Sequence, residues 1–426
     1  MRSVGVLSLG CKVNMYESEF VVNKLRENDY EIKKFTDVCD VYIINTCTVT
    51  NTSDAKSRKM IRSAIKRNSK ACVVAMGCFV EANKDSLPDG IDIIIGNKDK
   101  SRIVELLDEW FLKREKLVRL YEEEKNIFED MYITNFPGRT RAFVKIQDGC
   151  ENFCSYCIIP FVRGKCRSKQ KEKVLDEIKD LVNNNYKEIV LTGIHTGNYG
   201  VDLETNFAAL LREIVNIPGL YRLRISSIEI TELTDEVLEI IKNNKVIVNH
   251  LHIPLQAGSD IILKRMNRKY DLNYYFDVIN KIRKIRPNIA ISTDIIVGFP
   301  GETELLFLET IKTAKKIGFS KIHVFPYSER QGTEALKLDG VVPISERKER
   351  ARRLMAVSIE SEKEYMSSFI DSFEDVLIEE VRDGYSYGHT SSFLHVKIKG
   401  EFLNNSFVKV KINSVLYPYV CGEAVC

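Results

Sequence analysis

Short apolar runs alternate with amphipathic stretches along the first third of the chain. Runs of this length, separated by helical periodicity, are typical of parallel β-strands with helices packed on their faces. We therefore expect residues 1–115 to form a Rossmann-like parallel-sheet domain. The predicted strands cover residues 3–10, 41–47, 71–78 and 91–97, and the predicted helices cover residues 18–28, 55–68 and 102–115.

The same rhythm stops and then resumes. Residues 116–135 have little apolar periodicity and include the acidic run YEEEKN at 121–126, so we predict a linker. Residues 136–367 contain six further strand and helix units, which predict a partial TIM-like (β/α)6 barrel with its active face at the C-terminal ends of the strands. The predicted barrel strands cover residues 141–149, 188–195, 221–229, 248–256, 290–300 and 321–329.

The last part of the chain changes character after a charged helix at 345–369. Residues 373–426 consist of short alternating runs between turns such as RDGYSYGHTSS and LNNS. This pattern is typical of a small antiparallel β-barrel, which we assign to residues 368–426. The fold class is therefore α/β, with three domains.

Composition narrows the class of protein. Hydrophobic residues make up 44% and charged residues 29%, as in a soluble globular protein. No apolar run approaches the roughly 20 residues needed to cross a bilayer, and we find no signal peptide. Eleven cysteines in such a chain predict a reducing compartment, so we expect a cytoplasmic protein. The net charge of +3 is too small to indicate a polyanionic partner by itself.

Three cysteines follow the first barrel strand in the sequence DGCENFCSYCIIP. Cys150, Cys154 and Cys157 have C-x3-C-x2-C spacing. Three thiolates on one loop can hold three irons of a 4Fe-4S cluster and leave the fourth iron open to S-adenosylmethionine. The alternatives are a zinc site or a cluster completed by a distant cysteine, but the chain has no second C-x2-C pair for zinc. Such cluster chemistry needs no side-chain acid or base.

A second set of cysteines lies in the N-terminal domain. Cys11, Cys47 and Cys78 each follow a predicted strand, and strand ends of a parallel sheet share one edge. We expect these thiols to converge and to bind a second 4Fe-4S cluster. The alternative is that they are buried, inert thiols. The remaining cysteines are expected to be free thiols, and they are Cys39, Cys72, Cys166, Cys421 and Cys426.

The loop that carries Cys150, Cys154 and Cys157 resembles that of the radical S-adenosylmethionine superfamily, over residues 136 to 366. The resemblance implies cleavage of S-adenosylmethionine to a 5′-deoxyadenosyl radical that takes hydrogen from substrate. It also implies cofactor contacts in TGIHTG, SSIE and IVGFPGET: Gly193 at the methionine amine, Glu229 at the ribose, and Gly298 and Gly301 near the adenine. For each glycine the alternative is an ordinary strand-to-helix turn.

The motifs GCKVNMYES, INTCTVT and MGC, the radical loop and the terminal β-barrel together resemble the methylthiotransferase family across almost the whole chain. The resemblance implies an auxiliary-cluster domain, a radical barrel and a C-terminal TRAM domain that contacts RNA. It implies two uses of S-adenosylmethionine: one molecule methylates sulfur held at the auxiliary cluster, and another yields the radical. The product is a methylthio group in place of hydrogen on carbon.

Three branches of this family differ in substrate. They modify isopentenyladenosine in tRNA, N6-threonylcarbamoyladenosine in tRNA, or an aspartate of a ribosomal protein. The segments GCKVN, NTCTVT, TGIHTGNYG and GHTSS resemble the threonylcarbamoyladenosine branch. The resemblance implies the tRNA anticodon stem-loop as partner, an electron donor such as a flavodoxin or ferredoxin, and a sulfur donor. A different class, a non-catalytic iron-sulfur RNA-binding protein, stays open.

Two further features bear on substrate binding. His195 either touches substrate at the barrel mouth or is a structural loop residue, and we favour the structural role. Cationic clusters at 56–67 and 347–353 are candidates for phosphate contacts, with solvated helix faces as the alternative.

Overall fold

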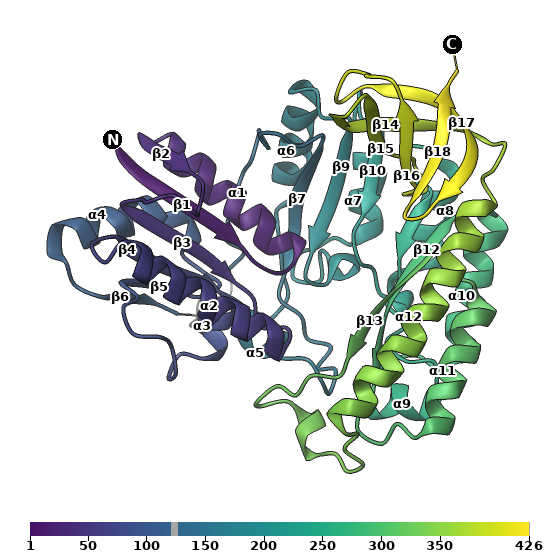
Figure 1. The fold of residues 1–426 in the computed structure, drawn as a ribbon, viewed down its shortest axis with the longest axis horizontal. Helices are drawn as coiled ribbons and strands as arrows, with labels where there is room; N and C mark the ends of the chain where they lie inside the picture. The colour runs from purple at the N-terminus through teal and green to yellow at the C-terminus, as the bar shows by residue number, and fades with distance from the viewer. Residues whose placement is uncertain (121–126, 426) are drawn as a thin grey trace.

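The structure, a computed structural model, describes residues 1–120 and 127–425. The acidic run at 121–126 and Cys426 therefore lie outside the described residues. Figure 1 shows a helix-covered sheet at the N-terminus, a curved barrel in the middle of the chain and a small β-barrel at the C-terminus. No helix in the described part of the chain is long and apolar enough to cross a membrane.

The N-terminal domain is a parallel six-stranded sheet with strand order β2-β1-β3-β4-β5-β6. Its central strands β3 and β4 are buried along their whole length, as expected where helices cover both faces. β2 was not predicted, and β6 lies in the segment expected to be a linker. The bounds are β1 Arg2–Ser8, α1 Lys12–Arg26, β2 Tyr30–Lys33, β3 Val41–Thr46, α2 Asn51–Arg67, β4 Cys72–Gly77, α3 Cys78–Ala82, β5 Ile93–Ile95, α4 Ile103–Lys113 and β6 Leu117–Arg119.

The middle of the chain forms the predicted partial barrel. β7, β9 and β10 form one parallel group, to which the short β8 is added antiparallel, and β11, β12 and β13 form another. Parallel bridges from Leu223 to Ile247 and from Ser227 to His252 join the two groups. The strands are β7 Arg141–Asp148, β8 Arg167–Ser168, β9 Glu188–Gly193, β10 Arg222–Ile225, β11 His250–His252, β12 Ala290–Val297 and β13 Lys321–Pro326.

Helices cover the outside of this barrel, and its core is one large apolar cluster. Met131, Ile133 and Phe136, which precede the first barrel strand, are buried in that core. The helices are α5 Ile159–Arg163, α6 Lys171–Asn183, α7 Phe207–Ile214, α8 Asp235–Asn243, α9 Asp260–Arg265, α10 Leu272–Ile285, α11 Glu304–Ile317 and α12 Ile344–Ser367.

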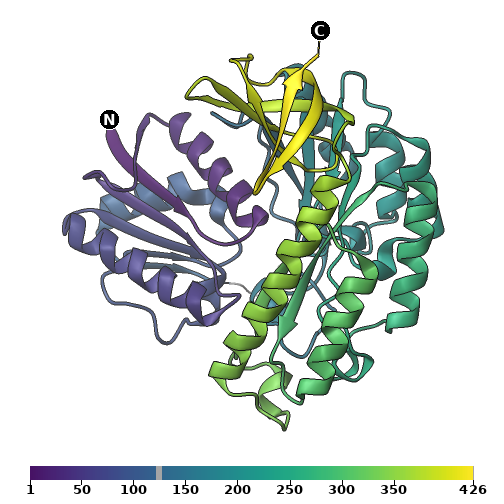
Figure 2. The same cartoon turned by 45° about the vertical axis from the view of Figure 1, so that its right-hand side comes forward.

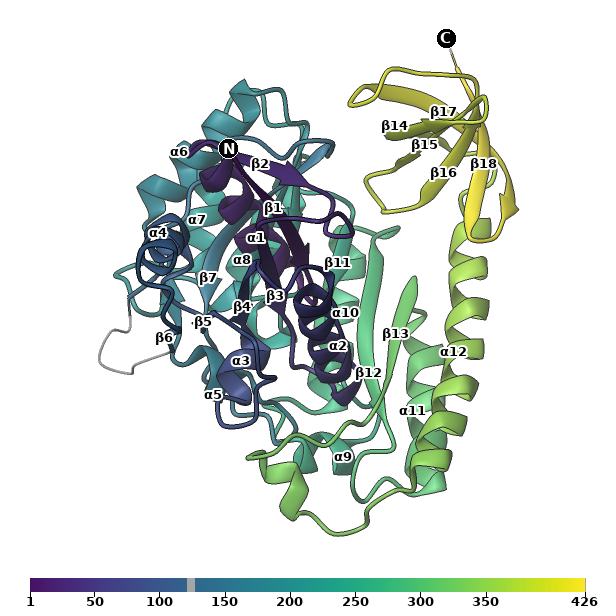
Figure 3. The same cartoon turned by 60° about the vertical axis from the view of Figure 1, so that its left-hand side comes forward.

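The C-terminal strands close into a barrel of five strands, which confirms the predicted small β-barrel. Its strand pairs are antiparallel, as predicted, except that His395–Lys399 and Tyr419–Ala424 pair in parallel. Helix α12 leads directly into this barrel (Figure 3). Arg222, at the start of β10, donates hydrogen bonds to the backbone carbonyls of His389 and Asp375 at 3.0 and 2.6 Å, so this barrel packs against the starts of the larger barrel's strands. The strands are β14 Phe373–Arg382, β15 Tyr385–His389, β16 His395–Lys399, β17 Phe407–Leu416 and β18 Tyr419–Ala424.

A buried ionic cluster fixes the N-terminal domain against the large barrel. The carboxylate of Glu17 on α1 accepts hydrogen bonds from Lys100 at 2.6 Å, from Lys145 at 2.9 Å and from Arg163 at 3.0 Å. Lys145 and Arg163 belong to the barrel, and all four side chains are buried. The open side of the barrel therefore faces the N-terminal sheet, with the C-terminal barrel above their junction (Figure 2).

Candidate active site

The predicted auxiliary cysteines meet at one edge of the N-terminal sheet. Cys11 follows β1 and begins the turn into α1, Cys47 follows β3, and Cys78 begins α3 directly after β4. Gly10 has φ +96°, and a Cβ there would lie 2.8 Å from Cys47 Sγ. Only glycine allows this approach between the Cys11 and Cys47 turns. The structure thus brings together the strand ends that carry these thiols.

Within this set, Cys78 raises the pKa of the other two thiols. Desolvation by the surrounding protein raises the pKa of the Cys11 thiol. The positive charge of Arg163 lowers this pKa, and Cys78 raises it. Burial also raises the pKa of Cys47, again with a contribution from Cys78. Arg163 Nε donates to Cys78 Sγ at 3.3 Å. Three neighbouring thiols beside a guanidinium suit an iron-sulfur cluster, whose binding displaces the thiol protons.

The second set of cysteines lies on the loop after β7. Gly149 has φ +78°, and a Cβ there would clash with the backbone carbonyl of Lys165 at 2.0 Å, so the loop must turn sharply at a glycine. Burial raises the pKa of Cys157 to about 12, with contributions from Cys154 and Cys150. No disulfide forms among the described cysteines. This set of thiols also suits an iron-sulfur cluster.

Arg268 and His195 contact the cysteines of this loop. The sequence patterns did not predict either contact. Arg268 donates to Cys154 Sγ at 3.2 Å and forms an ion pair with Glu229. His195 Nδ1 lies 3.7 Å from Cys150 Sγ, and its other ring nitrogen contacts Glu232. Burial lowers the pKa of His195, but hydrogen bonds to Cys150, Cys166 and Glu232 raise it to about 12 overall.

The proposed cofactor contacts lie around the same end of the barrel. Gly193 ends β9 and packs against Gln147, whereas Glu229 is held by Arg268. Gly298 and Gly301 follow β12 and have φ of +71° and +86°. Their roles toward S-adenosylmethionine stay predictions.

Two adjoining cavities connect the auxiliary cysteines with the radical loop. One, of about 620 Å³, is lined by Cys11 and Cys47 and by Tyr327 after β13. A smaller one, of about 180 Å³, shares Tyr327 and reaches Tyr156 in the radical loop and Asp294 in the barrel. A substrate placed in this space would meet Cys11 and Cys47 in one cavity and Tyr156 of the radical loop in the other.

A third cavity, of about 340 Å³, lies where the three domains meet. It is lined by Lys12 of the N-terminal domain, by barrel residues and by C-terminal-barrel residues. Five of the chain's six histidines line this cavity. The sequence did not predict this cluster, because the histidines come from separate strands of two domains. They are His250, His252, His323, His389 and His395.

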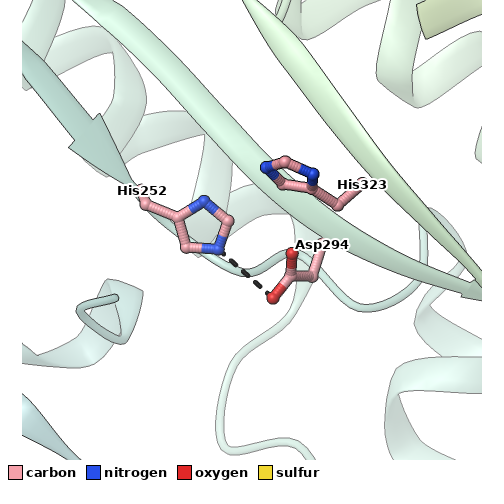
Figure 4. Close-up of side chains that lie close together, drawn as sticks. All are labelled: His252, Asp294 and His323. Carbon is pink, nitrogen blue, oxygen red and sulfur yellow. Dashed lines mark ion pairs between the residues drawn. The ribbon is translucent and has the colours of Figure 1, made fainter. Parts of the chain in front are cut away.

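His252, Asp294 and His323, at this cavity, lie close enough together to hold a metal ion. His252 Nε2 lies 3.2 Å from Asp294 Oδ2, and Figure 4 shows His323 facing the same carboxylate. The potential ligand atoms lie within 4.8 Å of one another. Two imidazoles and a carboxylate suit a transition metal. Lys12 and Arg224, which line the same cavity as His252 and His323, would repel a metal cation.

The two predicted phosphate-binding segments differ in the structure. On α2, the cations Lys56, Lys59, Arg62 and Lys66 are exposed. In the segment 347–353 the prediction is wrong for two arginines, because they are buried and their guanidinium groups bind protein. Arg347 donates to backbone carbonyls, and Arg350 pairs with Glu302.

Comparison with known proteins agrees with this geometry. The Radical SAM superfamily matches residues 144–314, and the Uncharacterized protein family UPF0004 matches residues 3–96. The fold is similar to the radical S-adenosylmethionine methyltransferase TsrM from Kitasatospora setae, with a TM-score of 0.55, 14% identity and coverage of 76% of this chain and 73% of that one. The cobalamin-dependent S-adenosylmethionine radical enzyme OxsB gives a TM-score of 0.54 at 12% identity, covering 83% of this chain and 56% of that one.

Curated relatives extend over the whole chain. "Threonylcarbamoyladenosine tRNA methylthiotransferase MtaB" of Bacillus subtilis is 42% identical, covering 100% of this chain and 97% of its own. The protein of the same name from Thermotoga maritima is 37% identical, covering 97% and 95%. The "tRNA-2-methylthio-N(6)-dimethylallyladenosine synthase" of Clostridium botulinum (strain Langeland) is 38% identical, covering 98% and 95%. With both cysteine sets in place and relatives matched from end to end, the chain belongs to the radical S-adenosylmethionine methylthiotransferase family.

Proposed function

We propose that this protein converts N6-threonylcarbamoyladenosine beside the tRNA anticodon to its 2-methylthio derivative. The observation that carries the proposal is the pair of adjoining cavities, one lined by Cys11 and Cys47 and the other by Tyr156 of the radical loop. The relatives named for this reaction, 42% and 37% identical over nearly the whole chain, support the choice of nucleoside.

The cysteines hold the metal cofactors in this proposal. Cys150, Cys154 and Cys157 hold the radical cluster, and Cys11, Cys47 and Cys78 hold the auxiliary cluster. When bound, the two 4Fe-4S clusters and S-adenosylmethionine supply the radical, the sulfur and the methyl group. Arg268 orients Glu229 for the ribose of S-adenosylmethionine, Gly193 lies at the methionine amine, and Gly298 and Gly301, which pack against Arg347 and Arg265, form the turn near the adenine.

The three domains divide these tasks. Residues 1–115 hold the auxiliary cluster, residues 136–367 form the radical barrel, and residues 368–426 form a TRAM domain that contacts the anticodon stem-loop. The exposed cations of α2 contribute phosphate contacts. We also propose an electron donor such as a flavodoxin or ferredoxin, a separate sulfur donor and a cytoplasmic location.

A second candidate substrate is isopentenyladenosine, because the Clostridium botulinum relative is named for the dimethylallyl nucleoside. The two nucleosides differ in chemistry at N6: one carries a carboxylate and a hydroxyl group, and the other only a hydrocarbon. A direct comparison of the two substrates therefore decides between the branches.

The test uses anaerobically reconstituted enzyme, S-adenosylmethionine and dithionite with two anticodon stem-loop RNAs. One RNA carries threonylcarbamoyladenosine and the other isopentenyladenosine. We expect 5′-deoxyadenosine to form and mass spectrometry to detect a methylthio group on the threonylcarbamoyl RNA alone. Modification of the isopentenyl RNA alone would contradict the substrate, and absence of 5′-deoxyadenosine with both clusters intact would contradict the enzyme.

A further inference from the structure

The cavity where the three domains meet contains buried donors that lack an acceptor. Arg224 on β10 is 3% exposed, and its Nε donates to Glu188 at 2.7 Å. Its two terminal nitrogens are buried and have no hydrogen-bond partner among the described residues. Nδ1 of His250, which lines the same cavity, also has no hydrogen-bond partner among the described residues, and it donates or accepts according to the tautomer. Buried donors are nearly always satisfied, so this arrangement is typical of a site that receives a ligand acceptor.

The charges around Arg224 favour an anion. Glu188 lies within 2.7 Å of Arg224 and 3.6 Å of Arg222, so two guanidinium groups share one carboxylate. Arg222 also has two backbone carbonyl acceptors, whereas Arg224 has only Glu188. Lys12 adds a further cation to the lining of the cavity. Glu362 also lines the cavity, but it pairs with Lys321 at 3.0 Å, so an anion bound here would meet the positive charge of Arg224 and Lys12.

The geometry suits a planar acceptor. The guanidinium carbon of Arg224 lies 4.5 Å from the centre of the Phe393 ring, which restrains the orientation of the group. Its two free nitrogens form a fork, and such a fork binds both oxygens of a carboxylate. His323 lines the same space and offers its ring nitrogens to hydroxyl or amide groups, whereas both ring nitrogens of His252 contact protein, at Ser292 and Asp294.

The position of the cavity relates it to the reacting site. Lys12 directly follows Cys11, and His252 of this cavity contacts Asp294, which lines the cavity that reaches Tyr156. In N6-threonylcarbamoyladenine the carboxylate is attached through N6 to C6, and the exocyclic bond at C6 diverges from the C2–H bond. A base that presents C2 to the cysteine sets can therefore extend its N6 substituent in another direction, and this cavity can receive the carboxylate.

We propose that this cavity binds the carboxylate of the substrate's threonylcarbamoyl group, with Arg224 as the bidentate partner and Lys12 as the second cation. The inference rests on the proposed function and adds the residues that determine its specificity. An isopentenyl group carries no charge and would leave the buried donors of Arg224 unsatisfied. The cavity therefore favours threonylcarbamoyladenosine and disfavours isopentenyladenosine.

Affinity measurements on the reconstituted holoenzyme test this inference. Three anticodon stem-loop RNAs differ only at the target nucleotide, which is threonylcarbamoyladenosine, its methyl ester or adenosine. We expect the acid to bind about 10- to 100-fold more tightly than the neutral ester at fixed salt. Arg224→Lys keeps a cation beside Glu188 but loses the fork, and Lys12→Met alters a side chain that reaches solvent. Each should reduce the acid-to-ester ratio at least about threefold.

Two control variants separate this effect from general ones. Arg222→Lys disturbs the contact with the C-terminal barrel, and Lys281→Met removes an exposed cation on α10. Both should leave the acid-to-ester ratio unchanged. An equal affinity of wild type for acid and ester would overturn the inference. So would an equal loss of affinity for all three RNAs in Arg224→Lys and Lys12→Met, because that result would indicate a backbone phosphate.

The outcome also separates this inference from the proposed function. A wild-type enzyme that prefers the acid form but does not methylthiolate it would contradict the proposed reaction and support the carboxylate site. A wild-type enzyme that methylthiolates the nucleoside with no acid preference would support the reaction and overturn the site.

Discussion

Arg163 connects the two halves of the active site through one guanidinium group. Its Nε donates to Cys78 Sγ, and its NH1 nitrogen donates to Asp148 at 2.9 Å, two residues before Cys150. The same nitrogen donates to Glu17 on α1. A single buried side chain thus links the auxiliary cysteines to the strand that carries the radical loop. No motif in the segment FVRGKC predicts this, because the contact depends on how two domains pack.

The auxiliary cysteines can be tested by iron content. Replacing Cys11, Cys47 and Cys78 by alanine should reduce iron from about eight to about four atoms per chain, since one cube is lost. Cleavage of S-adenosylmethionine should persist. Cys39→Ala is the matched control and should keep about eight irons, because Cys39 is buried before the start of β3, whereas Cys47 follows the end of that strand. A triple variant that still binds about eight irons would contradict the two-site assignment.

The carboxylate of Glu17 should contribute strongly to stability. Glu17→Gln leaves Lys100, Lys145 and Arg163 buried with less negative charge, so we expect a loss of about 3–5 kcal/mol in the free energy of unfolding at pH 7. Urea denaturation of the apoprotein measures it. Glu105→Gln, which breaks an exposed pair on α4, is the control and should cost at most about 1 kcal/mol.

This contribution should also depend on pH. Burial alone would raise the pKa of Glu17, but Arg163, Lys100 and Lys145 hold it well below its usual range. A lowered pKa in the folded state gives stability that is fully present above the unfolded carboxyl pKa of about 4.3 and is lost as pH falls toward the folded value. The difference between wild type and Glu17→Gln should therefore shrink below about pH 4. A difference that stays constant down to pH 3 would contradict this.

At the scale of elements, two helices with basic clusters differ in the exposure of their cations. The cations of α2 at Lys56, Lys59, Arg62 and Lys66 recur every three or four residues and lie on one exposed face. Those of α12 are divided, because Arg347 and Arg350 are buried against protein acceptors. Charge patterns predicted both as RNA contacts. The two basic clusters differ in the burial of their cations. On α12 this burial depends on the turn after β12 and on Glu302.

The exposed face of α2 should bind tRNA through phosphates. Replacing Lys56, Lys59, Arg62 and Lys66 by glutamine should weaken binding of modified and unmodified anticodon stem-loops alike. The slope of log affinity against log salt should fall by about one for each cation that contacts a phosphate. The control replaces Lys173 and Lys179 on α6, which pair with acidic residues. An unchanged slope in the α2 variant would contradict this role.

Most regular elements follow from sequence periodicity, and the exceptions have physical causes. The six barrel strands and α12 are apolar or strongly periodic, so their patterns predict them. β6 has three residues and β8 has two, too few to show a period. They form strands because an existing sheet edge offers them hydrogen-bond partners, which is a tertiary effect.

At the scale of the whole molecule, the packing of the domains forms three cavities. Cys11 and Cys47 line one and Tyr156 of the radical loop lines the next, and the placement of the auxiliary cysteines follows from the rule that parallel strand ends share an edge. The third cavity could not be predicted, because Lys12, Arg224 and Phe393 come from three domains and no local pattern relates them. If this cavity binds the substrate carboxylate as proposed, substrate choice depends on domain packing, whereas the cysteine sets were predicted from local motifs.

The central claim is that this chain places a methylthio group on threonylcarbamoyladenosine in tRNA. The most direct measurement is nucleoside mass spectrometry of bulk tRNA from cells that lack the gene. We predict that the 2-methylthio form disappears, that threonylcarbamoyladenosine accumulates and that isopentenyl-derived nucleosides stay unchanged. A plasmid with the wild-type gene should restore the 2-methylthio form, and one encoding Cys150→Ala should not. Unchanged 2-methylthio-threonylcarbamoyladenosine in the deletion strain would contradict the account.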